Sequence, residues 1–260
     1  GRAAVSRGSL ARLDQLPPGA KTLLQAAAVL GQRAPRDALS HLVPGAAASD
    51  ALSLIDAGLV RDDGPTLVFA HALIRDGAYD ALLKSRRREL HARAADWYAP
   101  ADPVLHAEHL DRAESPLAAR AYLHAARGEA AALRFDSARA LTERALARSM
   151  PGERFDGCIV LGEILLDCGR GHDARATFDE ALSQAPDDAG RCRALIGAAM
   201  VHRHADRIDD ALTALAEAQA LAERGSLKQA LSRLHHLRGN LFFPLGRVSE
   251  CEAEHRLALD

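Results

Sequence analysis

The sequence is poor in aromatic residues and has no long apolar run. Phe, Trp and Tyr together make up 4% of the 260 residues. Strands favour aromatic and β-branched residues, whereas Ala and Leu, which supply roughly a third of this chain, favour helices. We therefore predict a mainly α-helical fold. No apolar run reaches the roughly 18–20 residues that a membrane span needs, and no charged segment followed by an apolar one indicates a signal peptide.

Neither charge is in clear excess. The 33 Lys and Arg residues against 35 Asp and Glu give a formal charge of −2, without the basic surplus that is typical of nucleic-acid binding. The four cysteines lie far apart, without a C-x-x-C motif, and we interpret them as buried side chains in a reducing cytoplasm. The chain opens on Gly rather than Met, so we expect it to be a piece of a longer protein.

Catalytic motifs are missing as well. No G-x-x-x-x-G-K-[ST] loop is present to hold phosphates, because Gly19-Ala20-Lys21-Thr22 lacks both the upstream glycine and a preceding strand. Nothing resembles a Ser/His/Asp or Cys/His nucleophile, and the twelve histidines have no partners at zinc-ligand spacing. We predict that the chain is not an enzyme and by itself binds no metal or cofactor.

Residues 16–101 show the outline of a winged helix. Prolines at helix starts, glycines at helix ends and a possible N-cap at Ser49 predict three helices, at 17–31, 36–43 and 49–58. Asp63–Gly64, between two short apolar runs, then predicts a hairpin. Two amphipathic helices complete this domain, and residues 1–15 are expected to link it to a missing upstream domain.

Residues 102–260 repeat. Small residues at Ala138, Ala174, Ala211 and Cys251 are separated by 36, 37 and 40 positions, which predicts about four helix pairs after a transition helix. The pattern resembles the tetratricopeptide repeat, with Phe178 expected to fill the gap to the next pair. The usual aromatic residues of the first helix are absent, so a generic α-solenoid is the alternative. We expect the array to continue beyond Asp260.

Nearly the whole chain is similar to part of the bacterial STAND signal-transduction ATPases, in which a winged helix and tetratricopeptide-like repeats follow a nucleotide-binding domain. The resemblance lies in the segments 10–31, 54–64, 67–98 and 106–126. It implies a full-length ATPase that binds ATP or ADP with Mg, and an effector such as a nucleotide cyclase or a LuxR-type DNA-binding domain elsewhere.

The same resemblance implies that His71, in the run Phe69-Ala70-His71-Ala72-Leu73, reads the nucleotide bound to the missing domain. An imidazole can donate a hydrogen bond to a phosphate oxygen. Alternatively, His71 simply caps or packs at the start of its helix. Arg86, Arg87 and Arg88 form a basic cluster that is either a solvated helix face or a contact with the neighbouring domain.

The first helix of each repeat pair is expected to line a concave groove that binds a protein or small-molecule partner. The residues predicted to face this groove are Glu163, Leu166, Met200, Arg203, His236, Asn240 and Phe243.

Three functions follow. The first is a regulatory fragment of a STAND ATPase, in which the repeat arm binds an effector and the winged helix couples this event to the nucleotide state. The second is a free-standing adaptor for protein partners. A DNA-binding regulator is disfavoured, because the third predicted helix carries Asp50 and Asp56 but no Lys or Arg. We expect neither nucleic acid nor a membrane as a direct partner.

Overall fold

The computed structural model of the protein describes residues 15–259. The chain divides into two compact units, residues 1–121 and 122–260. The predicted linker over residues 1–15 lies outside the described residues, apart from Gln15. The division between the units falls later than the predicted boundary at residues 101–102, because α7 packs closely against α6 of the first unit.

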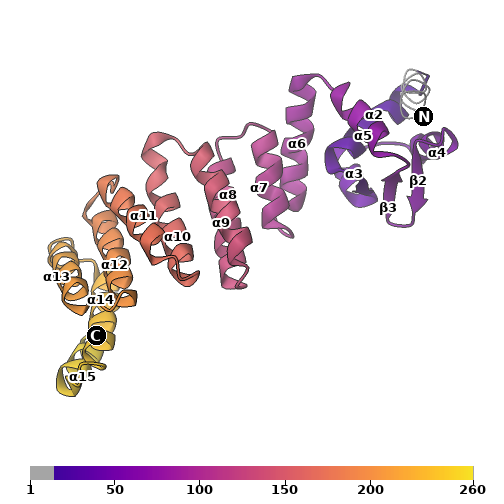
Figure 1. Cartoon of the computed structure of the whole chain (residues 1–260). Helices are drawn as coiled ribbons and strands as arrows, with labels where there is room; N and C mark the ends of the chain where they lie inside the picture. The colour runs from indigo at the N-terminus through magenta and orange to yellow at the C-terminus, as the bar shows by residue number, and fades with distance from the viewer. Residues whose placement is uncertain (1–14, 260) are drawn as a thin grey trace. The chain divides into compact units, whose positions relative to one another are not determined.

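The first unit contains helices and a small sheet (Figure 1). Its elements are α2 (Pro18–Leu30), β1 (Arg33–Pro35), α3 (Arg36–Leu42), α4 (Ala48–Asp56), β2 (Val60–Asp63), β3 (Thr66–Phe69), α5 (Ala72–Asp80), α6 (Lys84–Tyr98) and α7 (Pro103–Arg112). The strand order is β1-β3-β2, and both pairings are antiparallel. The predicted three helices and hairpin are present, and β1 adds a strand that the sequence did not indicate.

The hairpin and α4 differ in detail from the prediction. The turn consists of Gly64 and Pro65, one residue later than expected, because Gly64 adopts a positive φ of 61° and Asp63 pairs with Thr66 at the end of β2. The cap of α4 is Ala47 rather than Ser49. The Asp50 carboxylate reaches back to accept the Ala47 N–H at 3.1 Å, which starts the helix earlier.

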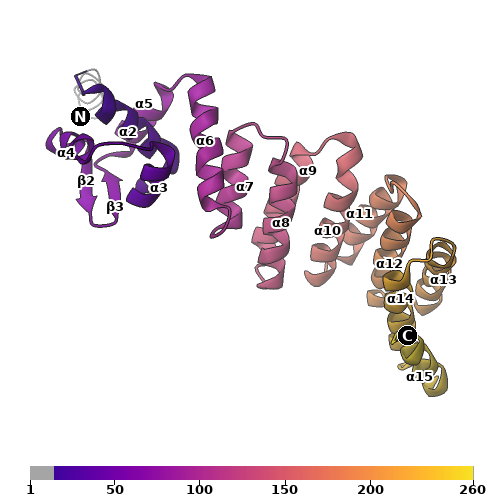
Figure 2. The same ribbon diagram turned by 180° about the vertical axis from the view of Figure 1, so that it is seen from behind.

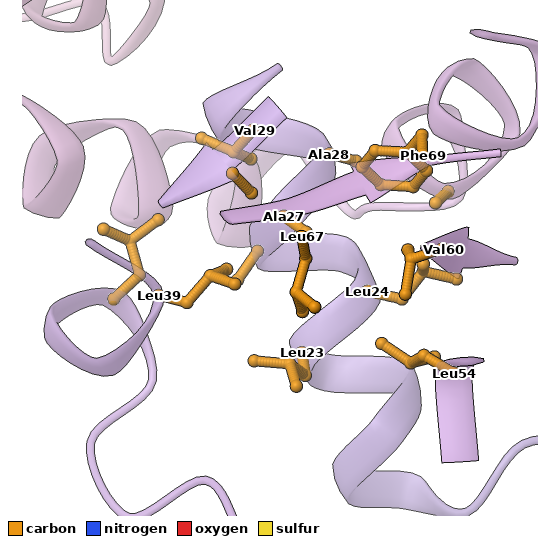
Figure 3. Close-up of a cluster of buried hydrophobic side chains, with 14 of the residues drawn as sticks. Leu23, Leu24, Ala27, Ala28, Val29, Leu39, Leu54, Val60, Leu67 and Phe69 are labelled. Carbon is orange, nitrogen blue, oxygen red and sulfur yellow. The ribbon is translucent and has the colours of Figure 1, made fainter. Parts of the chain in front are cut away.

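An apolar core joins the helices of the first unit to its sheet. Figure 3 shows side chains of α2 lying among residues from α3, α4, β2 and β3. Leu24, Leu54 and Leu67 are all almost fully buried. The amphipathic periodicity of α2 produces this packing, because its leucines and alanines recur on the side that faces the sheet.

The second unit is a stack of helix pairs, which Figures 1 and 2 show from two sides. The helix α8 (Ala118–Ala131) spans the division between the units. The elements that follow are α9 (Phe135–Arg148), the short 3-10 helix η1 (Pro151–Glu153), α10 (Arg154–Asp167), α11 (Gly171–Ser183), α12 (Asp188–His204), α13 (Ile208–Arg224), α14 (Lys228–Phe242) and α15 (Val248–Leu257). Each pair packs against the next, as a tetratricopeptide-like α-solenoid does.

The predicted small residues lie in the second helix of each pair. Ala138, Ala174 and Ala211 are completely buried, and Cys251 is 9% exposed. These positions tolerate only small side chains, because the paired helices cross closely there. The repeat alignment from the sequence is therefore confirmed.

Phe178 holds three consecutive helices together. The ring lies on α11, is 1% exposed, and faces Gly162 of α10 and Gly197 of α12. A Cβ added at Gly162 would lie 2.7 Å from the Phe178 Cζ, and one at Gly197 would lie closer still to the ring. The two glycines thus provide the space that the ring occupies, and the predicted role of Phe178 is confirmed.

Candidate binding groove

The seven residues predicted to face the groove come from the first helices of three successive pairs. The side chains of Glu163, Arg203 and His236 are exposed, and Phe243, just beyond the end of α14, is 69% exposed. The remaining three are half-buried: Leu166, Met200 and Asn240. All seven therefore lie on or near the surface of the second unit.

The structure connects only some of these seven residues. The Asn240 Nδ2 lies 3.1 Å from the His236 Nε2, one turn away on the same helix. Leu166 instead lines a cavity of about 420 Å³ near the ends of α10 and α12, together with His172, Arg175 and His204. Of the predicted set, Glu163 has the most distinctive surroundings.

Glu163 lies among arginines from three other first helices. Arg127 of α8, Arg193 of α12 and Arg233 of α14 are all close enough to act on the Glu163 carboxylate. The first helices of all four pairs thus contribute a charged side chain to one region of the second unit. We call Glu163, Arg127, Arg193 and Arg233 the groove charge cluster.

The Glu163 side chain is exposed, and the surrounding protein nevertheless removes part of the water from its carboxylate. Desolvation raises the pKa of Glu163 above its usual range. The positive charges of Arg233, Arg193 and Arg127 oppose this rise, and Asp167 adds to it. The net pKa is raised, so the cost of desolvation outweighs the attraction of the three arginines.

The arginines of the groove charge cluster differ in how firmly they are held. The Arg193 Nη1 donates to the Asp156 Oδ1 at 2.9 Å, and the guanidinium lies 5.4 Å from the ring centroid of Phe155. Within residues 15–259, Arg127 and Arg233 form no hydrogen bond or ion pair. Two of the three cations therefore have donors available for a ligand.

A cavity of about 490 Å³ opens between α12 and the beginning of α14. Arg193 and Arg233 of the groove charge cluster line it, together with Lys228. The rest of the wall is mostly apolar and consists of Ala189, Ile196, Leu227, Gln229 and Ala230. We call this space the α12–α14 cavity.

The sequence prediction included Glu163 but not the arginines around it. The repeat spacing contained part of the signal, because Arg127 precedes Glu163 by 36 residues, the interval between Ala138 and Ala174. Likewise, Arg193 and Arg233 are 40 residues apart, the interval between Ala211 and Cys251. Residues at equivalent repeat positions lie on the same side of the stack, but Glu163 and Arg193 are 30 residues apart rather than 37, so the spacing does not join the two pairs.

In the first unit, His71 stands immediately before α5. Its backbone oxygen accepts the N–H of Ile74 at 3.0 Å, whereas its imidazole is exposed and caps no backbone group of the helix. His71 is thus the N-cap residue of α5 and caps the helix through its backbone oxygen, not through its side chain. The nucleotide-sensing role of His71 stays a prediction.

The basic cluster on α6 has partners within the first unit. Arg86 pairs with Glu89 at 2.7 Å, and Arg88 pairs with Glu114. The guanidinium of Arg87 lies 4.3 Å from the ring centroid of Tyr79 and donates to the Tyr79 backbone oxygen. The predicted contact of Arg86, Arg87 and Arg88 with a neighbouring domain would have to compete with these interactions, and it stays a prediction.

A buried histidine pair joins α6 to α7. The Nδ1 atoms of His91 and His109 are 2.8 Å apart, and the Tyr79 hydroxyl lies 2.8 Å from the His91 Nε2. Only one proton fits between the two Nδ1 atoms, so one ring donates and the other accepts. Burial lowers the pKa of His91 to about 3 and that of His109 to about 4, which keeps both rings neutral.

Among residues 15–259, no group of three or more His, Cys, Asp or Glu side chains is arranged to hold a metal ion. No helix of that part of the chain is both long and apolar enough to cross a membrane. The cysteines at 158, 168, 192 and 251 are all free thiols, and burial raises the pKa of Cys158 to about 11.

Comparisons with solved structures place the fold among tetratricopeptide-repeat proteins. A STAND protein with a tetratricopeptide repeat sensor, from Pyrococcus horikoshii, matches 95% of this chain at 11% identity with a TM-score of 0.50. MamA from Desulfovibrio magneticus matches 66% of this chain and 93% of its own, at 12% identity and a TM-score of 0.50.

The match to the STAND protein covers 44% of that protein, so this chain spans less than half of its length. No protein-family model matches the chain, and no curated protein matches it either. At identities of 11% and 12%, the structural likeness shows the fold alone. The chain thus has a tetratricopeptide-like α-solenoid, a fold that generally binds protein partners.

Proposed function

We propose that the chain is a non-catalytic regulatory arm, in which the first helices of the repeats bind a protein partner. The observation that carries this proposal is the groove charge cluster, to which α8, α10, α12 and α14 each contribute a side chain. Cations that have no partner among the described residues, such as Arg233, lie beside the apolar wall of the α12–α14 cavity. Polar groups next to an apolar surface are typical of protein-binding sites.

The more specific proposal is that this arm belongs to a STAND ATPase. The STAND protein from Pyrococcus horikoshii supports it, because that match extends over 95% of this chain, including residues of both units. The order of α2, α3, α4 and the hairpin fits a winged helix, and His71 has an imidazole free to reach a nucleotide. ATP or ADP with Mg would then bind to a separate domain of a cytoplasmic protein.

In this proposal, coupling depends on two states of the full-length protein. In the resting state, the winged helix docks on the nucleotide-binding domain and His71 donates to a phosphate oxygen of ADP. Partner binding to the repeats favours the state in which this contact is broken, to the extent that the partner binds the two states with different affinity.

The test compares ADP retention by the full-length protein before and after His71→Ala. We expect faster ADP release, because one charge-assisted hydrogen bond is lost. His124→Ala is the matched control, since His124 is also exposed but lies on α8. Equal retention by the wild type and His71→Ala would rule out the sensor role.

A free-standing adaptor is the second candidate, and the groove charge cluster supports it equally well. The two candidates differ in one requirement, because an ATPase needs a G-x-x-x-x-G-K-[ST] loop in the same protein. Reading the complete gene settles this point. An open reading frame without such a loop leaves the adaptor as the remaining function.

A further inference from the structure

The charged residues that line the α12–α14 cavity are all positive. Three of its lining residues are cationic (Arg193, Lys228 and Arg233), and none is acidic. Among the described residues, Lys228 and Arg233 form no ion pair or hydrogen bond through their side chains. Like charges placed together repel each other, and an anionic ligand reduces that repulsion.

The neighbouring negative charges neutralise the cavity only in part. Asp156, which does not line the space, pairs with Arg193 at 2.9 Å, so Lys228 and Arg233 are the cations that keep their charge unpaired within the described part of the chain. Glu163 is shared among the three arginines of the groove charge cluster. In addition, α14 begins at Lys228 without an acidic residue in its first turn, so the positive end of the helix dipole adds to the same field.

The rest of the wall is suited to an apolar side chain. Ile196 and Leu227 lie beside the cations and belong to the apolar core of α12 to α14. The volume of about 490 Å³ can hold side chains of a few residues. Nucleic acid is a poor fit, because its binding depends on many phosphate contacts along the backbone, whereas this cavity offers three cations.

Resting on the proposed binding function, we infer that the α12–α14 cavity binds an acidic peptide segment of the protein partner. Lys228 and Arg233 hold side-chain carboxylates of the peptide, and an adjacent apolar residue packs on Ile196 and Leu227. Arg193 keeps its ion pair with Asp156 and adds to the positive potential of the cavity wall. The Glu163 charge acts on Arg233 from nearby and repels the peptide carboxylates, so it limits the affinity.

The experiment measures fluorescence anisotropy of a labelled twelve-residue peptide, three repeats of Glu-Leu-Glu-Ala, with the full 260-residue chain. The comparison peptide has Gln in place of every Glu. We expect the Glu peptide to bind at least roughly tenfold more tightly, because charged hydrogen bonds contribute about 1.5–3 kcal/mol each. Added salt should weaken the Glu peptide more than the Gln peptide.

Four variants, one of them a control, locate the contact. Arg233→Gln and Lys228→Gln should each weaken the Glu peptide roughly fivefold to tenfold. Arg191→Gln is the matched control, because it removes the same charge from an exposed position of α12 outside the cavity. Glu163→Gln should tighten peptide binding by about threefold, since it removes a nearby negative charge that repels the peptide.

The outcomes separate this inference from the proposed function. Equal binding of the Glu and Gln peptides, equal losses in Arg233→Gln and Arg191→Gln, or no Glu-peptide binding at about 1 mM would each overturn the acidic-peptide site. None of these results removes the proposed role as the arm of a STAND ATPase, which the ADP-retention test addresses separately. Displacement of the peptide by micromolar glutarate would also overturn the inference, because the cavity would then be a small-dicarboxylate site.

Discussion

Two buried junctions between helices use opposite chemistry. In the second unit, the Phe178 ring is 1% exposed and fills space left by Gly162 and Gly197. In the first unit, His91 and His109 are 0% and 3% exposed and meet through one hydrogen bond between their Nδ1 atoms. Equal burial thus has different consequences: the apolar junction depends on volume and the polar one on protonation.

The largest effect is expected at the apolar junction. Phe178→Ala removes a buried ring and leaves a cavity between α10, α11 and α12, which should lower the free energy of unfolding by about 3–5 kcal/mol. Circular dichroism during urea unfolding measures the change. Phe243→Ala is the control, because that ring is 69% exposed. A loss at Phe178 no larger than at Phe243 would contradict the role assigned to the junction.

The polar junction should respond to pH instead. Unfolded histidines have a pKa of about 6.5, whereas folded His91 and His109 have pKa values of about 3 and about 4. Their contribution is therefore complete above about pH 6.5. It is lost as the pH falls towards 4, because the unfolded chain takes up protons that the folded one does not. The expected loss is up to about 1.4 kcal/mol per pH unit for each histidine.

The fluorescence of Trp97 is the readout for this prediction. Trp97 is the one tryptophan of the sequence and lies on α6, the helix that carries His91. Urea midpoints should fall between pH 7 and pH 5, and His109→Gln should flatten the dependence. His124→Ala, an exposed control, should leave it unchanged. Constant midpoints over this range would refute the protonation argument.

The smallest expected effect comes from filling the space beside Phe178. Gly197→Ala places a methyl group against the ring and should reduce stability by about 1–3 kcal/mol. Gly128→Ala is the matched helical control, because nothing lies within 4 Å of the added Cβ. There alanine should stabilise by up to about 1 kcal/mol. Effects of the same sign in the two variants would show that the ring is not tightly held.

Periodic features of the fold could be predicted from the sequence. The repeat spacing located the buried positions Ala138, Ala174 and Ala211 and the role of Phe178, because every repeat imposes the same steric requirement. The glycine that faces Phe178 from the next pair, Gly197, was not among the positions that the repeat spacing marked.

Contacts that do not recur at the repeat interval could not be predicted from the sequence. Strand β1 has only three residues, ends in proline, and exists because Arg33–Pro35 pair with β3. The His91–His109 contact joins residues 18 positions apart with no motif to mark it. The sequence indicated Glu163 as one of seven candidates for the predicted groove. That three arginines from other helices lie near Glu163 became visible only from the packing of the four helices.

The position of Phe178 links the interior of the arm to its binding surface. Gly162 directly precedes Glu163, and Gly197 directly follows Ile196 of the α12–α14 cavity. The size of this ring therefore sets the spacing between the helix that carries the central carboxylate and the helix that carries Arg193. We therefore expect substitutions at Phe178 to alter binding at the proposed site from within the core, without changing any side chain that would contact the partner.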